Sequence, residues 1–404
     1  MPLPIPYPLL TGLLAALAAV GPFSIDTYLP VFPMIAAELG ASRLEVQQSL
    51  TAYMAPFAAM VLWHGTVSDA LGRRRVLIVA MLLYAASSLA CAFATDIRWL
   101  WLGRALQGVC AGAGMVVGRA VVRDLLEGAR AQRLMSHVMM VFGIAPAVAP
   151  IVGGLLVGIG GWRSIFAMLA GLGLVLALTC WRWLPESLPP ERRQRIHPLE
   201  LAHAYRSVLV QPVFMTLSGA MALNFAGFFI YVLSAPMFLM HHLGLEADAF
   251  GWFFVPTVSG MVIGSMVSGR MAGRWSQRRA IASGYLVMGG AVAINLTVSS
   301  ALPPVLPWSL VFAPIYTFGM ALAMPALTLM ALDCFPLRRG LAASCQGFLQ
   351  MGLNALVAGA LAPMVWASTL GLAIGAATLT LAGGLLFVLW WRRLAGSAQS
   401  LSPR

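Results

Sequence analysis

The chain has 404 residues, of which 60% are hydrophobic and only 9% are charged, and its mean hydropathy is +0.86. Soluble domains carry roughly 25% charged residues, so this composition excludes a soluble protein and indicates a membrane protein.

The formal charge of +12 does not indicate nucleic-acid binding. All 25 basic residues are arginines, and most of them flank alternate connections between apolar segments. That alternation predicts that both termini lie in the cytoplasm.

Twelve apolar segments follow one another along the chain, each close to the about 20 residues that a spanning helix needs. They cover residues 8–35, 45–67, 76–95, 99–122, 136–159, 162–184, 213–239, 249–269, 280–301, 305–331, 340–366 and 369–391. We therefore predict an all-α membrane protein with twelve transmembrane helices in two six-helix pseudo-repeats. The predicted parts are an N-terminal bundle (1–184), a cytoplasmic connection (185–212) and a C-terminal bundle (213–404).

Two charged residues lie within these apolar segments at positions that suggest a function. Asp26 is the only charge in Leu9–Ile35, and a lone ionisable group in hydrocarbon is costly and marks an ion or substrate pathway. Arg104 lies in the outer half of the fourth segment. Each of them either faces an internal cavity or extends to the outer interface, since both lie within a few turns of a segment end.

The connection 185–212 is the longest hydrophilic stretch of the chain. Within it Leu201, Tyr205, Val208 and Leu209 recur at helical spacing. This pattern fits a short helix on the inner membrane surface, and an unstructured linker is the alternative.

Polar and aromatic side chains inside the segments are candidates to line a substrate cavity. Gln346, Gln350 and Asn354 recur every four residues and therefore share one face of the eleventh segment. Such groups either join helices or bind a ligand. The other candidates are Tyr28, Gln47, Asn224, Phe228 and Tyr231.

No motif indicates catalysis, a cofactor or a metal. The chain has no lysine for a nucleotide-binding P-loop. Its five cysteines show no paired spacing, which indicates apolar packing rather than disulfides or metal ligands. His241 and His242 are adjacent, but a loop pair without further ligands is the simpler interpretation. We expect no enzyme activity, no cofactor and no metal site.

The two halves carry a repeated loop sequence. Gly65–Arg75 (GTVSDALGRRR) joins the second and third segments, and Gly269–Arg279 (GRMAGRWSQRR) joins the eighth and ninth. The two loops share glycines and arginines, although the second lacks the acid. Paired repeats of this kind are typical of secondary transporters.

Three motifs resemble those of the major facilitator superfamily. The loop motif is carried by Gly65, Asp69, Gly72, Arg73 and Arg74; the fourth-helix motif lies in LWLGRALQG, with Arg104 in register; and the fifth-helix antiporter motif is carried by Ala149, Pro150, Gly153 and Gly154. GPFSIDTYLP, GRAVVRDL and LPES further resemble the Bcr/CflA branch of drug:proton antiporters. Two residues depart from the pattern: Ala149 replaces the usual glycine, and Ala70 replaces a common basic residue.

The resemblance implies a proton-coupled efflux transporter for lipophilic small-molecule drugs, acting as a monomer in the bacterial inner membrane by alternating access. It implies that Asp26 carries the proton, that Arg104 tunes the proton affinity of Asp26, and that Arg73 pairs with Asp124 in a cytoplasmic latch. The alternative is a proton-coupled importer of a small metabolite with the same fold, which the antiporter motif disfavours.

Overall fold

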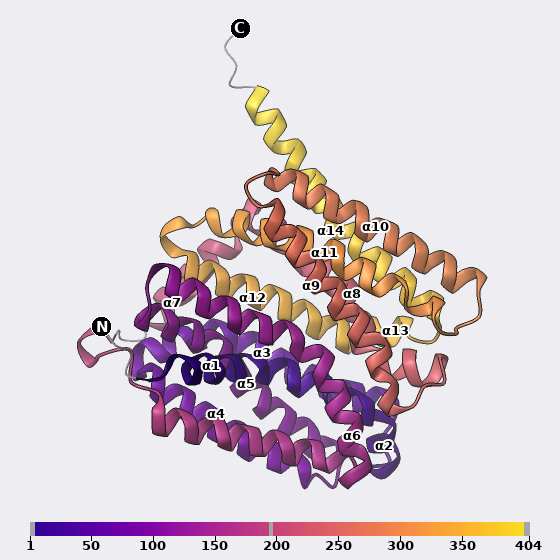
Figure 1. The fold of residues 1–404 in the computed structure, drawn as a ribbon, viewed down its shortest axis with the longest axis horizontal. Helices are drawn as coiled ribbons and strands as arrows, with labels where there is room; N and C mark the ends of the chain where they lie inside the picture. Colours follow the sequence, from indigo (N-terminus) through magenta and orange to yellow (C-terminus); the bar gives the residue numbers. More distant parts are fainter. Residues whose placement is uncertain (1–4, 194–196, 400–404) are drawn as a thin grey trace. The chain divides into compact units, whose positions relative to one another are not determined.

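The computed structural model describes residues 5–193 and 197–399, and every regular element in those ranges is helical (Figure 1). Residues 1–4, 194–196 and 400–404, at the ends of the predicted bundles and within the predicted connection, lie outside the described residues.

The first half begins with a helix broken into three pieces. These are α1 (Tyr7–Asp26), the 3-10 turn η1 (Leu29–Val31) and α2 (Phe32–Glu38). The next elements are α3 (Arg43–Leu71), α4 (Arg73–Ala92), α5 (Ile97–Leu125) and α6 (Gly128–Trp183). The last of these includes a break at Gly160 and Gly161, where Gly161 has a φ of +65°. The break coincides with the boundary between the predicted segments 136–159 and 162–184.

The second half follows η2 (Pro190–Arg192) and α7 (Pro198–Leu209). It contains α8 (Pro212–Leu233), the π-helical η3 (Pro236–His242), η4 (Ala247–Phe250), α9 (Gly251–Met271), α10 (Gln277–Ala301), η5 (Trp308–Leu310) and α11 (Phe312–Asp333). It closes with η6 (Pro336–Arg338), α12 (Arg339–Leu356), the π-helical η7 (Val357–Leu361), α13 (Ala362–Val365) and α14 (Thr369–Gln399).

Local sequence signals fix several helix starts. Ser42 and Glu45 form a capping box at the start of α3: the Ser42 hydroxyl accepts from the Glu45 amide (3.2 Å), and the Glu45 carboxylate accepts from the Ser42 amide (2.8 Å). The Asp96 carboxylate accepts from the Arg98 amide at the start of α5 (2.7 Å). These side chains satisfy amides that have no partner inside the helix.

Ten helical segments of the described residues are long and apolar enough to cross a bilayer. The segment through α6 is counted once although it joins two predicted spans, and α3 is not among the ten. Twelve crossings therefore remain our proposal, in which α6 crosses twice and α3 once. The surface agrees with a membrane location, since large apolar side chains such as Phe93 (77%), Ile159 (82%) and Leu286 (78%) are exposed and would aggregate in water.

The connection forms a helix over part of its length. In α7, Val208 is buried and Leu201, Tyr205 and Leu209 are half-buried, whereas Arg206 is exposed. The helical spacing of the apolar residues therefore indicated a real helix rather than an unstructured linker.

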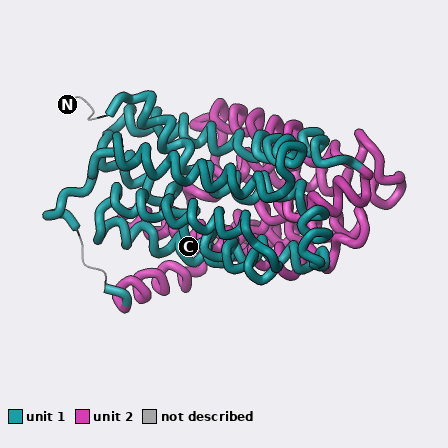
Figure 2. The backbone as a smooth tube through the Cα atoms, turned by 90° about the horizontal axis from the view of Figure 1, so that it is seen from below, with its two compact units in different colours: residues 1–198, 245–254 teal, residues 199–244, 255–404 magenta. Residues whose placement is uncertain are grey.

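The chain divides into two compact units (Figure 2). Unit 1 contains Met1–Pro198 and Leu245–Phe254, and unit 2 contains Leu199–Gly244 and Val255–Arg404. The short segment Leu245–Phe254 thus belongs with the first half, although it lies in the second half of the sequence.

Glycines allow close contacts between helices within each unit. A methyl group on Gly108 of α5 would overlap the backbone carbonyl of Tyr53 in α3. In unit 2, a methyl group on Gly260 of α9 would overlap the carbonyl of Pro314 in α11. Small residues are the means by which helices in lipid reach van der Waals contact.

We expect Gly108→Ala to lower the free energy of unfolding by about 1–3 kcal/mol, because the added methyl must push α5 away from α3. The measurement is the thermal unfolding midpoint of the purified protein in detergent. The matched control is Gly171→Ala in α6, where a methyl would meet nothing within 4 Å. Equal midpoints for the two variants would contradict the close-contact interpretation.

Candidate functional site

Asp26 is the last residue of α1 and lies inside unit 1. Only 3% of its surface is exposed. Its Oδ1 atom is buried and finds no hydrogen-bond partner among the described residues. The backbone around it is held locally, since the Thr27 hydroxyl donates to the Phe23 carbonyl (2.5 Å). The Oδ1 atom has thus lost its water without gaining a hydrogen bond, which is costly when the carboxylate is ionised.

Arg104 of α5 is completely buried. Its guanidinium carbon lies 4.8 Å from the centre of the Tyr28 ring and 4.3 Å from that of Tyr53. One nitrogen, Nη1, donates to Gln107 Oε1 (2.8 Å), whereas Nε and Nη2 have no hydrogen-bond partner in the described chain. Two aromatic faces thus stabilise the cation partly, and two of its donor atoms remain available.

A chain of hydrogen bonds leads from Arg104 back to the helix of Asp26. Gln107 Nε2 donates to Ser88 Oγ (2.7 Å), and Ser88 Oγ donates to the carbonyl of Tyr84 (2.7 Å). The Tyr84 hydroxyl lies 2.5 Å from the hydroxyl of Ser24, which precedes Asp26 by two residues. Helices α1, α4 and α5 are therefore connected by polar contacts in the apolar interior of unit 1.

Asp26 and Arg104 do not form an ion pair: the five ion pairs closer than 4.0 Å in the described part of the chain involve other residues. Tyr53, whose ring lies against Arg104, donates from its hydroxyl to the carbonyl of Gly21 (3.3 Å) in the helix that ends at Asp26. The two charges that the sequence singled out thus share one interior region but do not touch. We call Ser24, Asp26, Tyr28, Tyr53, Tyr84, Ser88, Arg104 and Gln107 the unit 1 polar cluster.

The antiporter motif packs against the helix end that carries Asp26. A methyl group on Gly153 would overlap the carbonyl of Thr27, the residue after Asp26. A methyl on Gly154 would come 2.7 Å from the carbonyl of Ala247 in η4. Ala149 is fully buried and Pro150 is buried too. The motif glycines therefore set how closely α6 approaches the end of α1.

The loop motif forms a network around Arg73, the first residue of α4. Arg73 Nε donates to Asp124 Oδ2 (3.2 Å), Nη1 donates to Ser68 Oγ (2.5 Å), and Nη2 pairs with Asp69. The side chain of Arg73 is only 8% exposed. Each guanidinium nitrogen of Arg73 thus has an oxygen partner. One of these partners is the Asp124 carboxylate, which is the pairing that the resemblance implied.

The neighbouring motif residues tie this network to α6. Arg74 Nε donates to the Cys180 carbonyl (3.4 Å), and Arg74 Nη2 donates to the Trp181 carbonyl. Gly65 contributes its carbonyl to Arg73 Nη1 (3.5 Å). Gly72 has a φ of +97°, a conformation that glycine adopts readily.

Glu186 and Ser187, which follow α6, complete the network and carried no role in the sequence analysis. Glu186 Oε1 accepts from the backbone amides of Arg73 (2.9 Å) and Leu188 (3.1 Å). The Ser187 hydroxyl donates to Asp124 Oδ2 (2.9 Å). A side chain on Gly72 would collide with the Glu186 carboxylate. The LPES sequence was the available signal, but only the fold brings it to the start of α4.

The candidate cavity residues of the second half are mostly held by neighbours in unit 2. Asn224 is fully buried, its Nδ2 donates to the Tyr285 hydroxyl (2.8 Å), and its backbone carbonyl accepts from the Tyr316 hydroxyl (2.9 Å). Its side-chain Oδ1 has no hydrogen-bond partner among the described residues. The Tyr231 hydroxyl accepts from Asn295 Nδ2 (2.8 Å). These bonds join α8 to α10 and α11, so both side chains stabilise the helix packing of unit 2.

The polar stripe of α12 is different. Gln346 is 5% and Asn354 0% exposed. Gln346 Nε2 and both polar atoms of the Asn354 amide find no hydrogen-bond partner among the described residues. Gln350, between them, is half-buried. Since unpaired amides are costly in an apolar interior, this stripe has free hydrogen-bonding capacity for a ligand or water.

The remaining candidates of the first half lie in the interior of unit 1. The Tyr28 hydroxyl lies 2.8 Å from Ser49 Oγ, and Gln47 is buried. Phe228, in unit 2, is half-buried. Tyr28 thus contacts both Arg104 and α3.

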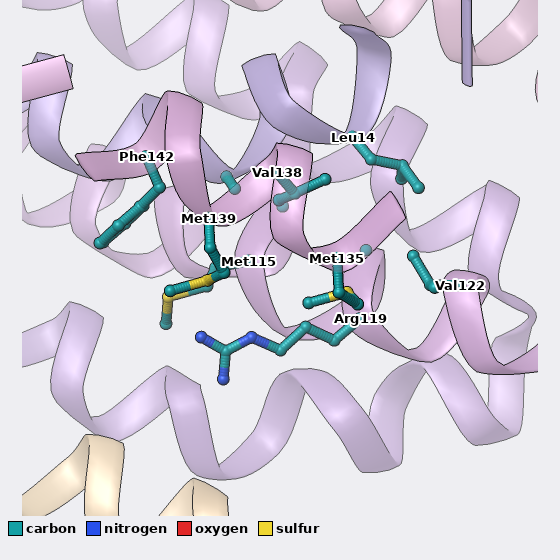
Figure 3. A pocket seen from close by; sticks show the side chains of 11 residues that line it. Leu14, Met115, Arg119, Val122, Met135, Val138, Met139 and Phe142 are labelled. Carbon is teal, nitrogen blue, oxygen red and sulfur yellow. The ribbon is translucent and has the colours of Figure 1, made fainter. Parts of the chain in front are cut away.

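A narrow cavity of about 10 Å³ lies between α1, α5 and α6 in unit 1. Figure 3 shows the Arg119 side chain extending beside it toward Met115, with Met135, Met139 and Phe142 from α6 around it. This volume holds about one water molecule, whereas ligand pockets measure roughly 300–1,000 Å³. The cavity is therefore not a drug site in this conformation.

Among the described residues, no three His, Cys, Asp or Glu side chains come together as metal ligands do. His242 Nε2 is hydrogen-bonded to the carbonyl of Trp366 (2.8 Å).

Comparison with known proteins identifies the family of the chain. A family model described as Major Facilitator Superfamily matches residues 14–363. The chain belongs to this superfamily. It is therefore a transporter of the major facilitator type, an integral membrane protein that crosses the bilayer several times.

Relatives and a solved structure agree with the assignment. The chain is 33% identical over 351 residues to the "Uncharacterized MFS-type transporter YdgK" of Bacillus subtilis (strain 168), covering 86% of this chain and 87% of that protein. It is 31% identical over 326 residues to a "Chloramphenicol resistance protein" of Pseudomonas aeruginosa, covering 77% and 74%. A crystal structure of a D-xylose-proton symporter has a TM-score of 0.74 at 15% identity, covering 94% of this chain and 97% of that one. That likeness shows a common fold.

We expect Glu186→Ala to lower the free energy of unfolding by about 1 kcal/mol, because the Arg73 and Leu188 amides lose their acceptor. The thermal unfolding midpoint in detergent measures this. The matched control is Glu191→Ala, an exposed glutamate of the same connection, which should leave the midpoint unchanged. If the two variants behave alike, Glu186 does not hold the start of α4.

Proposed function

We propose that this transporter exports lipophilic small molecules from the bacterial cytoplasm in exchange for protons, as a monomer in the inner membrane. The observation that carries the proposal is a buried, unpaired Asp26 at the point where the antiporter motif packs on α1. The relative named as a chloramphenicol resistance protein supports drug export. The proposed topology has twelve crossings, six before residue 185 and six after residue 212, with both termini in the cytoplasm.

The proton step follows from the surroundings of Asp26. An enclosed carboxylate is more stable protonated, and a hydrated carboxylate is more stable ionised. Gly153 contacts Thr27 directly, so any shift of α6 against α1 changes how enclosed Asp26 is. Alternating access would then expose Asp26 to water on one side of the membrane and enclose it before the other side opens.

Arg104 is suited to respond to that step. The rings of Tyr28 and Tyr53 hold its guanidinium without neutralising it, so its field remains available to Asp26. When Asp26 ionises, the free Nε and Nη2 donors of Arg104 offer a compensating charge inside unit 1. Burying both charges without such compensation would be strongly unfavourable.

Substrate binding and gating are assigned to two other groups of residues. The α12 stripe of Gln346, Gln350 and Asn354 is our first candidate for ligand hydrogen bonds, because two of its amides have free polar atoms. The Arg73 network is the candidate for a cytoplasmic latch, because Arg73 at the start of α4 forms ion pairs with both Asp69 and Asp124.

The decisive test is transport of labelled chloramphenicol into inside-out membrane vesicles with an acidic lumen. The wild-type chain should accumulate the drug above its equilibrium level, because outward proton flow from the lumen drives uptake. We expect Asp26→Asn to lose accumulation at least ten-fold while keeping facilitated equilibration, since an amide cannot exchange protons. Full accumulation by this variant would exclude Asp26 as the proton carrier.

The matched control is Asp96→Asn, which removes an exposed carboxylate that caps α5. Because asparagine also caps helices, this variant should transport like the wild type. A loss in both variants would indicate a general effect of charge removal.

The second candidate function is proton-coupled import, since the fold is shared with a D-xylose-proton symporter. The same vesicles distinguish the two directions. An importer would move its substrate out of acidic vesicles together with protons, and chloramphenicol would not accumulate.

We expect Arg104→Lys to reduce the rate of gradient-driven accumulation by about ten-fold, although it keeps the positive charge. A lysine ammonium lacks the planar guanidinium that stacks between Tyr28 and Tyr53 and bonds to Gln107. Initial rates at several lumen pH values measure this effect. An unchanged rate and pH profile would show that charge alone is needed at position 104.

A further inference from the structure

The second copy of the repeated loop carries arginines that have no acidic partner in the described part of the chain. Arg270, Arg274, Arg278 and Arg279 are all exposed at the junction of α9 and α10. None of them lies within 4.0 Å of an acidic side chain in the described part of the chain. We call Arg270–Arg279 the α9–α10 basic loop.

In the first copy of the repeat, the arginines interact with groups inside the chain. Arg73 is enclosed by Asp69 and Asp124, and Arg74 donates to the carbonyls at the end of α6. These interactions engage all three guanidinium nitrogens of Arg73 and two of the three of Arg74 inside unit 1. The second copy has no acid in the loop, so its arginines remain available to a partner outside the chain.

One of these arginines is held in place by aromatic rings. The Arg278 guanidinium carbon lies 5.0 Å from the Trp391 ring and 5.8 Å from the Trp390 ring, both in α14. This cation–π contact positions the guanidinium without engaging its N–H groups in a hydrogen bond. Such a group is ready to bind oxygens of a phosphate in its own plane.

The same end of unit 2 has the aromatic composition of a membrane interface. Trp275, in the loop itself, is 38% exposed, and Trp390 and Trp391 lie near the end of the apolar part of α14. Tryptophan rings are enriched at the level of lipid headgroups. A basic loop next to such tryptophans fits the level of headgroup phosphates.

We propose that the α9–α10 basic loop binds the phosphodiester headgroup of an anionic phospholipid in the leaflet that it faces. In the topology proposed above, the loop faces the cytoplasmic leaflet. The lipid-binding inference rests on that proposal only in assigning which side of the membrane the lipid lies on. Arg278 provides the positioned contact, and Arg270, Arg274 and Arg279 provide the surrounding positive charge. A free phosphate offers the same oxygens but has no acyl chains to anchor it beside the tryptophans.

The test measures binding of fluorescent phosphatidylglycerol to the purified full chain in a nonionic detergent, with phosphatidylcholine as the uncharged reference. Wild-type protein should bind phosphatidylglycerol at least ten-fold more tightly. Because each arginine near an anionic surface contributes about a five-fold factor in affinity, the double variant Arg274→Gln/Arg278→Gln should bind about 25-fold more weakly. Its thermal unfolding midpoint without lipid should match the wild type.

The matched control is Arg339→Gln, because Arg339 is exposed but already pairs with Asp333 (2.8 Å). It should keep the wild-type affinity for phosphatidylglycerol. Equal affinities for the two lipids, or equal losses in the control and the double variant, would overturn the proposal. Displacement of the lipid by inorganic phosphate at low millimolar concentration would overturn the assignment to a lipid. Binding is measured without transport, so it stands or fails separately from drug export.

Discussion

The structure depends on how an apolar interior accommodates charge. Asp26 and Arg104 lie in the same bundle, and both have lost their water without pairing with each other. A separated arrangement of this kind is expensive if both groups are ionised. The surrounding tyrosines reduce the cost for the cation, whereas Asp26 Oδ1 has no hydrogen-bond partner in the part of the chain that the structure describes. In the function proposed above, proton exchange at Asp26 is what would relieve this cost.

Backbone contacts connect the two buried charges to helix position. The antiporter motif supplies glycine where α6 meets the carbonyl next to Asp26, and the fourth helix supplies Gly108 where it meets Tyr53. Both contacts join a helix to the immediate neighbourhood of a buried charge. Small residues therefore do more here than increase packing density: they make the environment of each charge depend on how a neighbouring helix lies.

The sequence was sufficient for the features that follow from local composition. Apolar length predicted the positions of the helices, including the boundary between the segments 136–159 and 162–184, and a single carboxylate in an apolar segment identified Asp26. Contacts between distant segments could not be read in this way. Nothing local to Glu186 shows that its carboxylate accepts from the Arg73 amide, and the spacing of Asn224 and Tyr231 could not distinguish a ligand site from bonds to Tyr285 and Asn295. The superfamily is established by the comparisons, and the Bcr/CflA branch remains our interpretation of shorter motifs.

The contact between Gly72 and Glu186 has an evolutionary consequence. Position 72 requires glycine for two reasons: its left-handed backbone, and the carboxylate that occupies the space of a side chain. A lineage that shortens residue 186 removes only the second restriction, because the backbone at position 72 (φ +97°, ψ 144°) lies in a region that essentially only glycine occupies. Homologues should therefore keep glycine at position 72 even where residue 186 has been replaced.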